Sequence, residues 1–76
     1  MAMLNITFNG LSADYPLELD AHITDADVRR IAVEVVRSGA VTGLHVPHVA
    51  DGAFDNFVVD RMGQRIYLRP KVPFGA

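Results

Sequence analysis

The basic side chains near the C-terminal end are the residues best suited to bind a charged partner. From Arg61 onward the chain holds Arg61, Arg65, Arg69 and Lys71 and no acidic residue, whereas the preceding part holds three arginines and all nine carboxylates. The net charge is therefore −6 before Arg61 and +4 from Arg61 onward. Cationic side chains can engage carboxylates or phosphates, and Tyr67, between Arg65 and Arg69, can stack on a base or a peptide group. This segment is a candidate partner-binding site.

Other interpretations of this basic segment stay open. An edge strand often carries charge only to prevent sheet-to-sheet association. Glu18, Asp20 and the acidic start of the predicted helix can also neutralise the arginines within the chain. Among the binding interpretations, an acidic protein surface is favoured over nucleic acid, because phosphate-driven affinity needs more positive charge than a chain of net charge −2 offers.

The tail KVPFGA adds an aromatic side chain to this site. Pro70 and Pro73 stop a strand, so we expect residues 72–76 to form an extended tail that carries Phe74. Phe74 either folds back onto its own domain or inserts into a second copy or another partner. Together, the predicted partner-binding residues are Arg61, Arg65, Tyr67, Arg69, Lys71 and Phe74.

Two histidines in HVPH have a spacing found in metal sites, but the chain around them argues against metal binding. His45 and His48 are three residues apart, and Asp51 and His22 could complete a ligand set. However, Pro47 favours extended chain, in which residues three apart tend to face opposite ways rather than converge on one ion. We expect surface histidines and no metal ion.

Catalytic chemistry has no clear basis in the residue types. The chain lacks Cys, and its only serines, Ser12 in a predicted turn and Ser38 at a predicted helix end, lie in no nucleophile motif. Asp25 and Asp27 are explained as residues of a helix start. We therefore expect no enzyme activity, no catalytic residue and no cofactor.

The alternation of apolar and polar residues predicts the N-terminal strands. In LNITFNG, apolar and polar side chains alternate with the period of a strand that buries one face. Asn9-Gly10 favours a tight hairpin turn, although the stretch up to Asp14 also permits a longer loop. The second strand is predicted in YPLELD and pairs back onto the first.

A helix is predicted in ITDADVRRIAVEVVRSG. Thr24 is its expected N-cap and Gly39 its left-handed end. Arg30 and Glu34 lie one turn apart on the solvent side. The buried stripe has helical spacing and consists of Val28, Ile31, Ala32, Val35 and Val36.

The second half predicts another hairpin. Residues 39–52 form an edge strand or an extended loop, because Pro47 cannot donate to a central ladder. NFVVDR and QRIYLRP flank a turn at Met62-Gly63. On the last strand, Ile66 and Leu68 share one face, and the opposite face is shared by Arg65, Tyr67, Arg69 and Lys71.

These elements predict one α+β domain over residues 1–76, with a flexible start at residues 1–3. The expected arrangement is ββαββ, with a possible further strand, and one helix packed on a mixed or antiparallel sheet. In its opening hairpin and in LELDAHITDADVRRI, the chain resembles the ubiquitin-like β-grasp superfamily. That resemblance implies a β-grasp-like fold and, as one alternative function, a protein modifier. The chain ends Phe74-Gly75-Ala76, where conjugated modifiers carry Gly-Gly.

The favoured function is a small non-catalytic protein-protein interaction module that uses the C-terminal hairpin and tail. The run Phe57, Val58 and Val59 is apolar on both faces of a strand, which suggests a second chain as cover and hence a homodimer. Nucleic-acid binding by Arg61, Arg65, Arg69 and Lys71 is the alternative. The chain has no apolar run long enough to cross a bilayer and no signal-peptide pattern, so we expect a cytoplasmic protein without a membrane partner.

Overall fold

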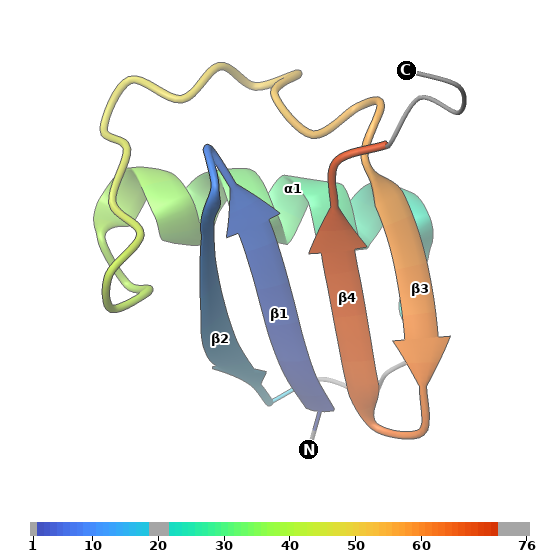
Figure 1. Ribbon diagram of the computed structural model, residues 1–76. Coiled ribbons are helices and arrows are strands. Elements are labelled where there is room, and N and C mark those ends of the chain that lie inside the picture. The colour runs from blue at the N-terminus through green and yellow to red at the C-terminus, as the bar shows by residue number, and fades with distance from the viewer. Residues whose placement is uncertain (1, 19–21, 72–76) are drawn as a thin grey trace.

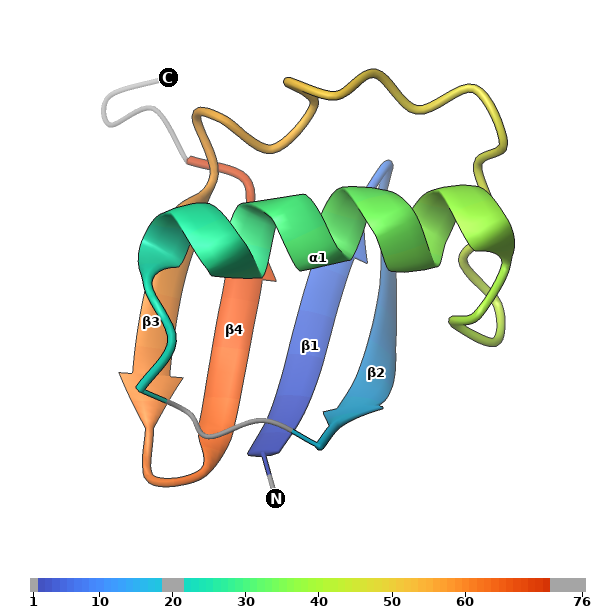
Figure 2. The same ribbon diagram turned by 180° about the vertical axis from the view of Figure 1, so that it is seen from behind.

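The computed structural model describes residues 2–18 and 22–71 and contains one helix packed on one face of a four-stranded mixed sheet (Figures 1 and 2). The strand order is β2-β1-β4-β3. The predicted α+β class and ββαββ arrangement are confirmed. In chain order, the elements are β1 (Ala2–Phe8), β2 (Leu11–Leu17), α1 (Asp25–Ser38), β3 (Val58–Met62) and β4 (Arg65–Arg69).

The first hairpin closes through the tight turn predicted at Asn9-Gly10. Phe8 pairs with Leu11, and Asn9 and Gly10 have φ values of 53° and 79°, as the commonest two-residue hairpin turn requires. The longer loop is thus wrong. β2 begins at Leu11, earlier than predicted, and Leu19 and Asp20 of the predicted second strand lie outside the described residues.

The start of the chain is also more ordered than predicted. Ala2 and Met3, which we expected to be flexible, belong to β1, where they pair with Leu17 and Pro16. Ala2 is buried because it lies on the sheet face that α1 covers. β1 therefore spans the whole length of β2.

Both predicted ends of α1 are confirmed. The Asp27 amide donates to the Thr24 hydroxyl at 3.1 Å, and Gly39 adopts the left-handed conformation while its amide donates to Val35. The predicted stripe is buried except for Ile31, which is half-buried, and Val33 is buried in addition. Val33 lies on the side of the helix where Asp51 and Asp55 line the same hollow.

The centre of the sheet is the parallel pair β1 and β4. Leu4 pairs with Ile66 and Ile6 with Leu68, and all four side chains are fully buried. These side chains face α1, whose Val28, Ala32 and Val36 are fully buried. This packing of α1 on one side fixes which residues of each strand face the opposite side.

Residues 40–57 form turns and contain no strand, so of the two predicted alternatives the loop is correct. Phe54 is fully buried and packs edge-on against Phe8 of β1 and against Phe57, with ring centroids 5.2 Å and 4.9 Å apart. Phe57 precedes β3 and is therefore not part of a strand that is apolar on both faces. Its ring packs within its own chain instead. The aromatic contacts hold the loop against the sheet.

Candidate partner-binding face

The face of the sheet turned away from α1 is covered by no other element among the described residues (Figures 1 and 2). Its members follow from strand alternation and from the pairing register. We call this surface the open face. It comprises Met3, Asn5 and Thr7 of β1, Ser12, Asp14 and Pro16 of β2, Val58, Asp60 and Met62 of β3, and Arg65, Tyr67 and Arg69 of β4.

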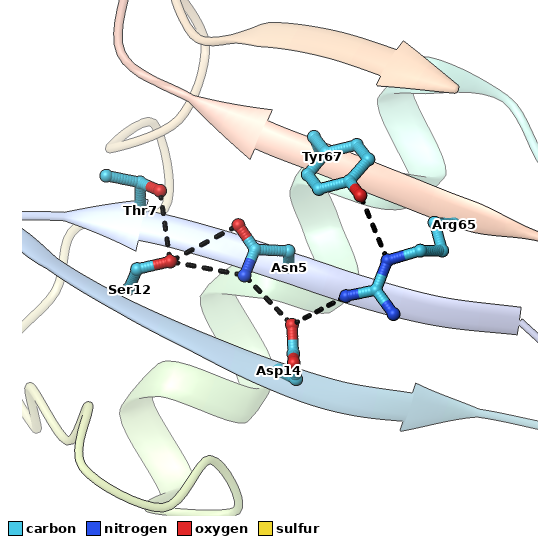
Figure 3. Close-up of polar contacts among 6 residues, drawn as sticks. All are labelled: Asn5, Thr7, Ser12, Asp14, Arg65 and Tyr67. Atoms are coloured by element: carbon cyan, nitrogen blue, oxygen red, sulfur yellow. Dashed lines mark hydrogen bonds and ion pairs between the residues drawn. The ribbon is translucent and has the colours of Figure 1, made fainter. Parts of the chain in front are cut away.

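The β1–β2 half of the open face is a connected polar network (Figure 3). The Asn5 amide group donates to Ser12 Oγ at 3.1 Å and to Asp14 Oδ1 at 2.9 Å. Ser12 Oγ also lies 3.3 Å from Asn5 Oδ1 and accepts from the Thr7 hydroxyl at 3.4 Å. These side chains therefore use their hydrogen-bonding groups on one another. The sequence pattern did not indicate this network, because Ser12 was expected in a turn.

Arg65 joins this network to Tyr67. Its Nε donates to the Tyr67 hydroxyl at 3.0 Å, its Nη2 lies 3.5 Å from Asp14 Oδ1, and its guanidinium carbon is 5.7 Å from the Tyr67 ring centroid (Figure 3). The hydrogen bond to Tyr67, with a further contribution from Asp14, raises the pKa of Arg65 above its usual value. Like any arginine, Arg65 is charged throughout the pH range in which proteins are normally handled, and its contacts with Tyr67 and Asp14 fix where that charge lies on the open face.

The other predicted cations are distributed differently from the prediction. Arg69 is on the open face and pairs with Asp60. Arg61 is on the opposite side of the sheet, because it pairs in register with Ile66, and it donates to Asp25 and to the Ile23 carbonyl. Arg61 therefore does not share a face with the other predicted basic residues, and the expected neutralisation by the acidic helix start is found at Arg61.

Of the remaining two predicted residues, the structure describes only Lys71. Lys71 follows β4, is exposed, and makes no hydrogen bond or ion pair with any other described residue. Phe74 lies outside the described residues. The structure thus brings Arg65, Tyr67 and Arg69 together as predicted, with Lys71 beyond them in the chain.

A shallow hollow of about 400 Å³, open to solvent, lies at the β3–β4 side of the sheet. Met62, at its edge, is 69% exposed, the highest exposure of any large apolar side chain that the structure describes. Met62 was not among the predicted partner-binding residues. The hollow is lined by Asp60, Arg61, Met62, Tyr67 and Arg69.

The histidine segment does not assemble a ligand set. Within residues 2–18 and 22–71, no three His, Cys, Asp or Glu side chains lie close enough to hold a metal ion. His45 lies against Gly39, with ring atoms 3.3 Å from the position a Cβ would take there. Asp51 instead accepts a hydrogen bond from Arg37 at 2.8 Å.

No helix in the described part of the chain is long and apolar enough to cross a membrane. The chain matches no model of a known protein family, no curated protein and no solved structure. The geometry of the open face is therefore the basis of the functional proposal.

Proposed function

We propose that this protein is a small non-catalytic module that binds another protein through the open face of its sheet. The observation that carries the proposal is that α1 covers one face only, while the uncovered face presents Tyr67, Arg65 and Arg69 next to the exposed Met62. Tyr, Arg and Met are enriched in protein interfaces because they combine contact area with directed or adaptable contacts. Lys71 and Phe74 extend the same end of the chain.

A protein partner is favoured over nucleic acid by the net charge of the chain. Phosphate-driven affinity needs more positive charge than a chain of net charge −2 offers, and Arg65 and Arg69 already contact Asp14 and Asp60. Nucleic-acid binding remains the alternative proposal, because Tyr67 between two arginines is also suited to stacking on a base. Its affinity would fall steeply and log-linearly with rising salt.

A second copy of the chain is one candidate partner. Pro16 on edge strand β2 and the charged Arg61 on the helix side of edge strand β3 both oppose pairing of sheet edges. A homodimer would therefore meet through the open faces. Native mass spectrometry at high micromolar concentration tests this, and a monomeric mass together with full thermal stability counts against it.

We also propose a relationship to the ubiquitin-like β-grasp superfamily. The mixed sheet with β1 and β4 parallel at its centre, and one helix after the first hairpin, supports it. Action as a modifier is a separate proposal, because it depends on Gly75 and requires removal of Ala76. Intact-mass analysis for loss of Ala76 and linkage to an amine tests that proposal.

The binding proposal is tested by affinity capture with four baits. These are the unchanged protein, Tyr67→Ala, Met62→Ser and a matched control, Arg30→Gln, which removes an exposed arginine from α1. A partner should be recovered with the unchanged and control baits. Tyr67→Ala should weaken the complex by about 2 kcal/mol of binding free energy. Equal recovery by all four folded baits removes the open face as the site.

A further inference from the structure

The two halves of the open face differ in what they leave for a partner. On β1 and β2, Asn5, Ser12 and Asp14 are hydrogen-bonded to one another. On β3 and β4, the exposed Met62 borders a hollow beside the half-buried Tyr67. An apolar side chain that filled this hollow would remove Met62 from water without breaking the polar network. The β3–β4 half is therefore the part suited to dock an apolar group.

The charges on this half of the sheet favour an acidic occupant. β4 and the residues directly after it carry Arg65, Arg69 and Lys71; Arg65 contacts Asp14 of β2 and Arg69 contacts Asp60, the one carboxylate on β3 and β4, so one positive charge is in excess. This local excess is opposite in sign to the net charge of −2 on the whole chain.

Unused hydrogen-bond donors also favour an acidic occupant. Arg69 contacts Asp60 through Nη2, which leaves its other guanidinium donors without a partner among residues 2–18 and 22–71. The Lys71 ammonium likewise has three donors and no partner within those residues. Carboxylates are the acceptors that would form charge-assisted hydrogen bonds with both groups.

We propose that the β3–β4 half of the open face binds a segment of a partner protein in which an apolar side chain is flanked by carboxylates. The apolar side chain lies against Met62 and Tyr67 in the hollow, and the carboxylates engage Arg69 and Lys71. This inference rests on the proposed function and specifies its partner's chemistry.

Selection from a displayed library of random 12-residue peptides tests this proposal. The protein is immobilised at low salt, and the selected peptides are sequenced, synthesised and measured for affinity by titration. We expect Asp and Glu to be enriched around a central Leu, Ile, Phe or Met. Tyr67→Ala should weaken binding roughly 30-fold and Met62→Ser about tenfold.

Charge variants separate the partner's chemistry from the location of the site. Arg69→Gln should weaken the selected peptides at least about threefold at low salt and less at high salt, while Arg30→Gln on α1 should leave affinity unchanged. Neutral or basic peptides that still depend on Tyr67 would overturn the acidic-partner inference and leave the proposed function standing. Peptides unaffected by both Tyr67→Ala and Met62→Ser, or no selected peptides at all, would overturn the docking site itself.

Discussion

Phe54 should be the residue that most strongly holds the long loop on the sheet. Its side chain is fully buried and makes edge-on contacts with Phe8 and Phe57 at 5.2 Å and 4.9 Å. Replacing a buried Phe with Ala removes about 3–5 kcal/mol of unfolding free energy. A chain of 76 residues has roughly 4–11 kcal/mol in total, so Phe54→Ala should remove between about a quarter and all of the unfolding free energy.

A milder change keeps this prediction measurable in a folded protein. Phe54→Leu retains most of the apolar volume but loses two ring-ring contacts, each worth about 0.5–1.5 kcal/mol, so we expect a loss of about 1–3 kcal/mol. Urea denaturation followed by circular dichroism measures both variants against Leu11→Ala, which changes an exposed side chain and should cost less than about 0.5 kcal/mol. A cost below about 1 kcal/mol for Phe54→Ala would refute the view that Phe54 anchors the loop.

Two further predictions concern local structure. Thr24→Ala removes the hydroxyl that accepts from the Asp27 amide. It should cost about 1 kcal/mol of unfolding free energy, or roughly 4–8 °C in melting temperature. The control Thr42→Ala, at an exposed position, should change the melting temperature little, and equal shifts would contradict the capping role. Gly10→Val places a β-branched residue at φ 79° in a position with no neighbouring atom within 4 Å, so its expected cost of about 1–2 kcal/mol comes from the backbone alone. Gly10→Asn tolerates that conformation and should cost clearly less in the same denaturation experiment, and equal costs would point to a different turn.

Short-range patterns in the sequence were sufficient to predict the elements with local signals. Asn9-Gly10, Thr24 and Gly39 each act through backbone groups within a few residues, so their types alone indicated the turn and the helix ends. The start of β2 was missed because Ala13 and Asp14 are of residue types that are depleted in strands. Pairing with β1 outweighs that preference.

The long-range arrangement could not be predicted in the same way. Alternation indicated which residues share a face, but the parallel pairing of Leu4 with Ile66 joins distant segments of the chain. The loop was ambiguous because its buried Leu44, Val49 and Phe54 are spaced five residues apart, which is the period of neither a strand nor a helix.

The candidate site was predicted only in part for the same reason. Arg65, Tyr67 and Arg69 lie on one strand, so alternation placed them on one face. Arg61 is on the neighbouring strand, and its face depends on its register with Ile66. Met62 became a candidate only when its exposure at the edge of the hollow was known.

The central claim is that a partner protein contacts the open face, and site-specific photo-crosslinking tests it most directly. The chain contains no Cys, so Val58→Cys and Glu34→Cys each give one attachment point for the same crosslinker, on the open face and on the exposed side of α1. We predict a partner adduct of defined mass from position 58 and none from position 34, with the adduct lost when Tyr67→Ala is added. The same adduct from both positions, or an adduct from position 34 alone, would contradict the account.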